Sequence, residues 1–326
     1  EQALVEVLQN LESKRFEGIE NIWSKRDGAV IKSGIRAPIR DLGSLPIPDR
    51  DIFAAAGINE MGISVLNDFL DGQKVVSLAA GRGCPFKCSF CSNDPIRRAQ
   101  GANGGYVRAN PVDQLVAEMK QLNERFDPDF FELMGEIFPV KKGWMTDFAQ
   151  KYKKQIGKPF TTALRVGIFS REEYALLREA GCSLVYVGLE CGNEAYRRDV
   201  LNKPIKNEAF RRDFEILREL GIKTATFNMV CLPFETSQNI EETISFNREI
   251  AADFPMFFTY QPLPATQLFD LCARESLFKD ATKKKSHYFS HEPQIKVDIS
   301  QAEIEELWGK IVSLQKETTG ATQLVV

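Results

Sequence analysis

Short apolar runs alternate with helical patterns along residues 73–275. Such βα repetition is the signature of a parallel sheet whose strands are joined by helical crossovers. We therefore expect an α/β protein with a partial (β/α)6 TIM-like barrel, curled by right-handed crossovers. The six predicted strands are residues 74–80, 130–134, 160–166, 183–190, 223–230 and 256–263.

Start and stop signals mark several of the helices between these runs. An Asn-Pro pair precedes the helical pattern of residues 112–126, and Ser170 with Glu173 forms a predicted capping box. Gly181 and Gly221 each follow a helical pattern rich in Leu and Glu, as expected of a glycine that ends a helix before the next strand.

The two flanks of the barrel have other patterns. Residues 1–72 hold two short helical patterns followed by residues 35–53, which contain three prolines and have no lasting period. We predict that this segment is an N-terminal helical and extended connector, followed by the core, residues 73–275. Residues 276–326 form a predicted C-terminal helical extension that contains a capped helix from Ser300.

Composition and charge exclude several classes of protein. The chain has 326 residues, of which 43% are hydrophobic and 27% charged, so disorder and coiled coil do not fit. The 42 Lys and Arg nearly balance the 45 Asp and Glu, which leaves no global basic field for nucleic acid. The sequence has no apolar run long enough for a membrane span and no signal peptide at its start. We expect a cytoplasmic protein.

The sequence starts with Glu1 and enters an amphipathic run without a cap or preamble. We therefore expect it to be a piece of a longer chain.

Seven cysteines, an odd number in a long chain, argue against a disulfide framework. Cys84, Cys88 and Cys91 lie together in the segment GRGCPFKCSFCSN, where glycines and a proline favour a loop. The other four are scattered among apolar neighbours and are expected to be small buried hydrophobic residues. They are Cys182, Cys191, Cys231 and Cys272.

The clustered cysteines have two chemical interpretations. Three thiolates in a loop after the first barrel strand can hold an iron–sulfur cluster and leave one iron open for a ligand. The alternative is a zinc site completed by a distant fourth ligand, and a protein of that kind could be a non-catalytic scaffold or binding module.

The spacing CxxxCxxC, with an aromatic residue before the last cysteine, resembles the signature of the radical S-adenosylmethionine (SAM) superfamily. The resemblance implies that Cys84, Cys88 and Cys91 hold a [4Fe-4S] cluster whose fourth iron binds the methionyl group of S-adenosylmethionine. An electron from an external donor of flavodoxin or ferredoxin type would then release a 5′-deoxyadenosyl radical. Phe90 would pack near the adenine.

Further segments resemble the subgroup of this superfamily that carries an N-terminal cobalamin-binding domain. These are residues 179–205 and 221–236 in the core and residues 44–53 in the connector. The resemblance implies that residues 1–72 contain the tail of such a domain, and that cobalamin is bound by a domain absent from this sequence. The chain itself has no Asp-x-His-x-x-Gly motif to supply a histidine ligand for cobalamin.

Five more residues are predicted to contact S-adenosylmethionine. Glu190, at a strand end between two glycines, could accept both ribose hydroxyls, although a strand-end Glu is also a common surface charge. Arg165 lies in an apolar strand, where a buried arginine needs an anionic partner such as a carboxylate. Lys203 aligns with a basic position that grips the methionyl carboxylate in related enzymes, but a solvated lysine is the competing interpretation. Asn228 could bond ribose or adenine, and Glu136 loosely matches the region that receives the methionyl amino group.

Two reactions fit this resemblance. The first is cobalamin-dependent methyl transfer to an unactivated carbon of a small-molecule substrate, in which a carbon radical replaces deprotonation. The second is radical oxidation or ring closure without methyl transfer, as in the anaerobic magnesium-protoporphyrin monomethyl ester cyclases. The sequence does not name the substrate.

Overall fold

The computed structural model describes residues 1–50, 73–100, 105–139, 141, 143–279 and 291–319. Its centre is a parallel sheet with the strand order β3-β6-β7-β8-β9-β10. The six strands therefore lie in the sheet in the same order as along the chain. This sheet confirms the predicted partial TIM-like barrel. The strands are β3 (Val75–Ala79), β6 (Phe130–Met134), β7 (Phe160–Leu164), β8 (Cys182–Glu190), β9 (Lys223–Val230) and β10 (Phe254–Thr259).

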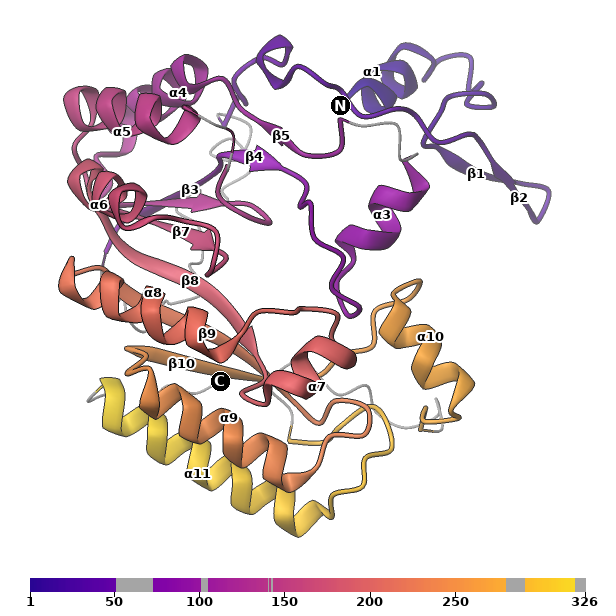
Figure 1. The fold of residues 1–326 in the computed structure, drawn as a ribbon. Coiled ribbons are helices and arrows are strands. Elements are labelled where there is room, and N and C mark those ends of the chain that lie inside the picture. Colours follow the sequence, from indigo (N-terminus) through magenta and orange to yellow (C-terminus); the bar gives the residue numbers. More distant parts are fainter. Residues whose placement is uncertain (51–72, 101–104, 140, 142, 280–290, 320–326) are drawn as a thin grey trace.

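Helices cover the outer face of the sheet, and shorter helices lie where its strands end (Figure 1). The outer helices are α4 (Val112–Phe126), α5 (Trp144–Gln155), α6 (Arg171–Ala180), α8 (Asn207–Glu219), α9 (Ser237–Glu249) and α11 (Gln301–Thr319). The shorter ones are α3 (Asn93–Ala99), α7 (Glu194–Asp199) and α10 (Gln267–Arg274).

Side chains of each strand alternate between the outer helices and the barrel interior. Val185 and Val187 of β8 belong to the large core that the sheet shares with the helices. Tyr186 points to the opposite face, where it stacks on Phe227 of β9 at a centroid distance of 5.6 Å. The barrel interior of β8 to β10 is therefore lined by aromatic side chains.

The predicted helix signals are confirmed. Ser170 and Glu173 form the capping box of α6, and Gly181 ends that helix with a φ of 116°. Gly221 follows α8 with a φ of 68°. The bounds of α4 are those predicted, because its apolar period and its Asn-Pro start are both local signals.

The N-terminal segment differs from its prediction. It contains the helix α1 (Gln2–Gln9), but the second expected helical pattern is replaced by an antiparallel hairpin. The hairpin turns at Asp27 and Gly28, whose φ angles are 49° and 80°. An Asp-Gly pair with both residues at positive φ is a strong hairpin signal, so the sequence did contain the information. The other elements in residues 1–50 are β1 (Trp23–Arg26), β2 (Ala29–Lys32) and η1 (Leu42–Ser44). Within the core, the short strands β4 (Gly81–Arg82) and β5 (Arg108–Ala109) pair antiparallel.

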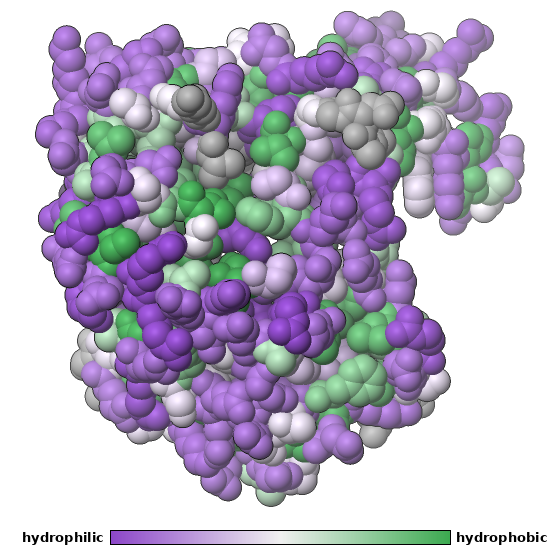
Figure 2. Space-filling model, in the orientation of Figure 1, coloured by the Kyte–Doolittle hydropathy of each residue, from purple (hydrophilic) through white to green (hydrophobic). Residues whose placement is uncertain are grey.

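The face drawn in Figure 2 is mostly hydrophilic, with apolar side chains gathered in small patches. Within the described part of the chain, no helix combines the length and the apolar character that a membrane crossing requires.

Candidate functional site

The three clustered cysteines lie in one loop, residues 83–92, which we call the cysteine loop. It joins β4 to α3 at the carboxyl end of the first barrel strand. All three cysteines are free thiols and are partly exposed. Catalytic groups of barrel enzymes are placed at this end of the strands.

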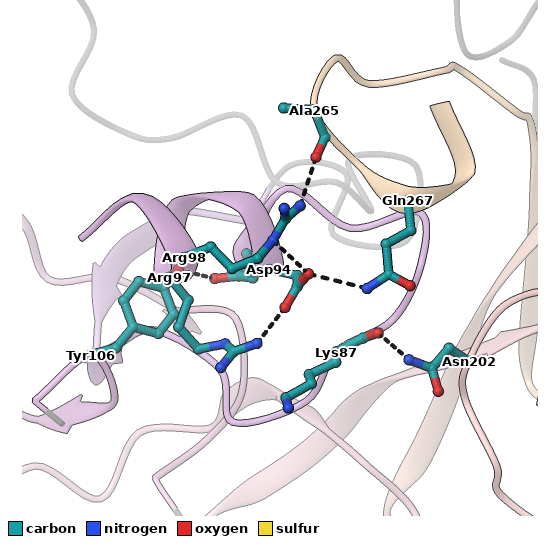
Figure 3. A network of polar contacts seen from close by, with 9 residues as sticks. Lys87, Asp94, Arg97, Arg98, Tyr106, Asn202, Ala265 and Gln267 are labelled. Carbon is teal, nitrogen blue, oxygen red and sulfur yellow. Dashed lines mark hydrogen bonds and ion pairs between the residues drawn. The ribbon is translucent and has the colours of Figure 1, made fainter. Parts of the chain in front are cut away.

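Hydrogen bonds from distant segments fix the backbone of the cysteine loop. The amide of Ser89 donates to the Leu201 carbonyl at 3.0 Å, and the carbonyl of Ser89 accepts from the Leu268 amide at 2.8 Å. The Asn202 side chain donates to the Lys87 carbonyl at 2.7 Å, as Figure 3 shows. The loop is thus held by the segments after α7 and at the start of α10.

Gly83 places the start of the loop where no other residue fits. Its φ is +82°, and a Cβ there would lie 2.3 Å from the Tyr106 carbonyl oxygen. Its amide donates to the carboxylate of Glu136 at 2.9 Å. The structure therefore brings Glu136, one of the predicted site residues, against the cysteine loop.

Burial raises the pKa of both Cys84 and Cys88. For Cys88, the nearby cations of Lys203 and Arg165 act in the opposite direction and favour the thiolate. Within the described ranges, no three His, Cys, Asp or Glu side chains are grouped closely enough for a single metal ion. An iron–sulfur cluster does not need such a group, because each cysteine binds a different iron atom.

Arg165 lies directly against the cysteine loop, just after the end of β7. Its Nη1 is 4.0 Å from the Sγ atom of Cys88, and its guanidinium stacks 3.7 Å from the ring centroid of Phe86. The guanidinium carries a fixed positive charge with donors in a planar fork. An anionic ligand bound beside the loop would therefore meet Arg165.

Glu190 and Lys203 are paired with each other. The Lys203 Nζ donates to Glu190 Oε1 at 2.8 Å and to the Gly188 carbonyl at 2.6 Å. Both side chains are nearly buried. Glu190 has a φ of 68° and follows a bulge in the pairing of β8 with β9, which turns its side chain toward the loop after α7.

Phe90 packs as an anchor of the loop. Its ring contacts the apolar cluster that contains Leu201, Tyr260 and Leu268. The loop is thereby attached to α7 and α10 through packing as well as through hydrogen bonds.

Asn228 does not lie with the other predicted site residues beside the cysteine loop. Its amide nitrogen donates to Thr226 Oγ1 at 3.0 Å and to the Met256 carbonyl at 2.9 Å, and its oxygen accepts from Asn247 of α9 at 3.0 Å. Asn228 is fully buried on the helix-covered face of β9, away from the barrel interior. Here the structure corrects the expectation of a contact with ribose or adenine.

Two polar networks beside the cysteine loop were missed in the sequence. The buried carboxylate of Asp94 accepts hydrogen bonds from Arg97, Arg98 and Gln267, which ties α3 to α10 (Figure 3). In the second network the Asn93 amide donates to the Cys91 sulfur at 3.5 Å. Asn93 follows the cysteine motif by two residues, and this closeness is the signal that could have found it.

Comparison with known proteins agrees with this geometry. The family model of the radical SAM superfamily matches residues 78–246, just over half of the chain. The chain belongs to the radical SAM superfamily. It is accordingly an enzyme, and the family implies a [4Fe-4S] cluster and S-adenosylmethionine as cofactors.

Curated relatives of this radical SAM protein are named for different reactions. An uncharacterized methyltransferase of Pyrococcus horikoshii is 23% identical over 285 residues, which are 87% of this chain and 58% of the relative. The anaerobic magnesium-protoporphyrin IX monomethyl ester cyclase of Rubrivivax gelatinosus is 27% identical over 278 residues, which are 82% of this chain and 47% of the relative. The chain thus spans about half the length of these relatives.

Solved structures share the fold. The cobalamin-dependent S-adenosylmethionine radical enzyme OxsB, with aqua-cobalamin and S-adenosylmethionine bound, matches with a TM-score of 0.67 at 13% identity, over 97% of this chain and 50% of OxsB. The methyltransferase TsrM of Kitasatospora setae, with cobalamin and a [4Fe-4S] cluster bound, matches with a TM-score of 0.64 at 15% identity, over 94% of this chain and 59% of TsrM.

Proposed function

We propose that this chain is the core of a cobalamin-dependent radical SAM enzyme that transfers a methyl group to an unactivated carbon of a small molecule. The observation that carries the proposal is the convergence of Arg165 and the Glu190–Lys203 pair on the half-buried thiols of the cysteine loop. This arrangement offers a thiolate set, a guanidinium and a carboxylate to one ligand.

The donor set suits a [4Fe-4S] cluster. Cys84, Cys88 and Cys91 are unpaired thiols on one fixed loop, and three cysteines leave one iron for S-adenosylmethionine. The three cysteines would hold this cluster, which when bound would supply the electron for reductive cleavage of S-adenosylmethionine. Binding of the cluster would deprotonate the thiols whose pKa burial now raises.

The side chains around the loop match the groups of S-adenosylmethionine. Arg165 would bind the methionyl carboxylate through two parallel hydrogen bonds. Glu190 would accept hydrogen bonds from the ribose hydroxyls through Oε2, since its Oε1 is bound by Lys203. Lys203 would then orient Glu190 and add positive charge near the carboxylate. Glu136 would receive the methionyl amino group, and Phe90 would pack beside the adenine.

The barrel interior would shield the reaction from water. Phe227 and Met256 line it from β9 and β10, and Met229 of β9 packs with the apolar cluster that also holds Phe90; all three are only partly buried by the protein itself. An apolar interior keeps a carbon radical away from solvent and from competing reactions. These side chains would therefore contact the substrate.

The fold neighbours OxsB and TsrM support cobalamin as the methyl carrier, because both structures contain it. The helix α1 exposes Leu4, Val5 and Leu8, an apolar face suited to contact with a neighbouring domain. We propose that such a domain binds cobalamin and that a flavodoxin or ferredoxin supplies electrons. A cytoplasmic location remains a prediction.

A second candidate function is radical oxidation or ring closure without methyl transfer. It is favoured by the likeness to the cyclase of Rubrivivax gelatinosus, which has a higher identity to this chain than the methyltransferase of Pyrococcus horikoshii. Both candidate functions would use the same cysteine loop and begin with the same one-electron reduction of S-adenosylmethionine.

Anaerobic reconstitution with iron and sulfide tests the proposal. The reduced protein is incubated with S-adenosylmethionine, and 5′-deoxyadenosine is measured by chromatography. We expect product from the wild type and from Cys182→Ala, a buried cysteine outside the loop, but none from Cys88→Ala. Product from Cys88→Ala, or zinc in place of iron in the wild type, would refute the proposed function.

The two candidate functions differ in their products. Methyl transfer gives S-adenosylhomocysteine together with 5′-deoxyadenosine, whereas oxidation or ring closure gives only the latter. The assay therefore includes cobalamin and the candidate substrate, and it records both nucleosides. A substrate turned over without S-adenosylhomocysteine would refute methyl transfer.

A further inference from the structure

A hydrogen-bonded pair of side chains points at one thiol of the cysteine loop. The amide nitrogen of Asn93 is 3.5 Å from the Cys91 sulfur, a normal length for an N–H···S hydrogen bond. The hydroxyl of Tyr106 donates to the Asn93 carbonyl oxygen at 2.6 Å. Asn93 is the first residue of α3, and Tyr106 precedes β5, so two separate segments build the contact.

Tyr106 is held firmly in place. Its side chain is buried, and burial, followed by the nearby Glu136 carboxylate, raises its pKa to about 12, so its hydroxyl remains a donor. Its carbonyl oxygen lies against Gly83 at the start of the same loop. The tyrosine thus contacts both ends of the cysteine loop, directly at Gly83 and through Asn93 at Cys91.

The Tyr106 hydroxyl and the Cys91 sulfur together set the orientation of the Asn93 amide. An asparagine side chain has a donor end and an acceptor end, and its acceptor end is bound by Tyr106. The donor end therefore faces the sulfur. In the reversed orientation the carbonyl oxygen would face a thiolate, and the two negative groups would repel each other.

We propose that Asn93, oriented by Tyr106, is a positioning residue that donates to the Cys91 thiolate and raises the reduction potential of the cluster. The inference rests on the proposed function, namely on a cluster held by Cys84, Cys88 and Cys91. A hydrogen bond to a ligand sulfur stabilises the additional negative charge of the reduced state. Asn93 thereby makes the cluster easier to reduce by an external donor.

The experiment is a redox titration of the reconstituted protein, followed by electron paramagnetic resonance without S-adenosylmethionine. Asn93→Leu keeps the branched shape of the side chain but removes the donor. We expect the ratio of reduced to oxidised cluster at a fixed potential to fall about tenfold, which corresponds to about 59 mV for one electron. Tyr106→Phe removes a single hydroxyl and should shift the ratio in the same direction by a smaller factor.

Asn202→Ala is the matched control. Asn202 also donates to the cysteine loop, but to the Lys87 carbonyl and not to a sulfur. We expect its cluster to keep the wild-type potential. An equal shift in Asn202→Ala, or no shift in Tyr106→Phe and Asn93→Leu at full iron content, would overturn the inference.

Iron content separates the two proposals. A wild-type protein that binds no iron under reconstitution would overturn the proposed function and this inference with it. A wild-type cluster with unshifted variants would overturn the role of Asn93 alone. If Asn93→Leu loses the cluster by unfolding α3, Tyr106→Phe decides the question, because it leaves the helix sequence unchanged.

Discussion

Lys203 donates a hydrogen bond to Glu190 across the carboxyl end of the barrel, with 2.8 Å between Nζ and Oε1. The lysine comes from the loop after α7, and the glutamate is the last residue of β8. The pair is nearly buried and lies beside Cys88, whose pKa both of its members influence. A buried ion pair of this kind fixes the two segments relative to the cysteine loop at the cost of desolvating both charges.

Gly188 makes room for this pair. A Cβ at that position would lie 2.2 Å from Glu190 Oε1 and 2.6 Å from Lys203 Nζ. We expect Gly188→Ala to displace both side chains, to lower the free energy of unfolding by about 1–3 kcal/mol and to reduce S-adenosylmethionine cleavage. Denaturant unfolding and the deoxyadenosine assay check this.

Gly309 of α11 is the matched control for that substitution. A Cβ there meets nothing within 4 Å, and the glycine is in a helix interior. Gly309→Ala should stabilise the protein by roughly 0.5–1 kcal/mol. A Gly188→Ala variant as stable as Gly309→Ala would contradict the close packing of the Glu190–Lys203 pair against Gly188.

Removal of Lys203 tests the ion pair itself. Lys203→Met keeps most of the side-chain volume but leaves Glu190 as an unpaired charge in a nearly buried site. We expect a loss of about 3–5 kcal/mol in the free energy of unfolding. The double variant Lys203→Met with Glu190→Gln should lose much less, because no unpaired charge remains. Denaturant unfolding of the wild type, the single variants Lys203→Met and Glu190→Gln, and the double variant forms a double-mutant cycle. Additive losses would show that the two residues are not coupled.

The sequence predicted those features of the fold that depend on local patterns of residues. The six barrel strands and the bounds of α4 follow from apolar runs, and the cap of α6 follows from Ser170 and Glu173. Glu190 and Lys203 were each singled out, but their contact was not foreseen. The distance between two side chains of different segments depends on the bulge after Gly188 and on the path of the following loop, and neither has a local pattern.

Asn228 shows how a face can be misjudged. In β9 the polar residues Thr224, Thr226 and Asn228 alternate with apolar ones. A ligand site inside the barrel would use polar side chains, so this pattern suggests that the polar face of β9 lines the interior. The structure turns this face toward α9, where Asn247 completes its hydrogen bonds. The apolar face lines the interior instead, so only the partner residue on α9 reveals the direction.

Hydrogen bonds from Arg197 hold the segment that carries Lys203. It is fully buried in α7, and its guanidinium donates to the carbonyls of Cys191 and Ile205 and to Asn207. Because a lysine cannot reproduce this fork of donors, Arg197→Lys leaves buried acceptors without partners. It should lower the free energy of unfolding by about 3 kcal/mol.

The neighbouring Arg198 is exposed and pairs with Asp199. Arg198→Lys should therefore change the free energy of unfolding by no more than about 0.5 kcal/mol. Urea unfolding of the two variants compares them, and equal losses would contradict the assigned role of Arg197.

Glu235 should make the stability of the protein depend on pH. Its carboxyl group is fully buried in the loop after β9, where Oε2 accepts from the Leu232 amide at 3.0 Å. Its Oε1 has no hydrogen-bond partner in the described part of the chain. Burial raises the pKa of Glu235 to about 8, well above its ordinary value of 4.5, although the backbone amides act in the opposite direction.

The sign of the effect follows from proton binding. Between pH 4.5 and about 8 the folded state keeps the proton of Glu235 and the unfolded state does not, so stability falls as pH rises. The slope approaches 1.4 kcal/mol per pH unit, and from pH 6 to pH 7.5 the wild type should lose about 2 kcal/mol relative to Glu235→Gln. The glutamine keeps an acceptor for the Leu232 amide but cannot ionise, which makes it the matched reference. Urea unfolding of both proteins at the two pH values measures the difference, and parallel pH profiles would show that Glu235 is ionised in the folded protein.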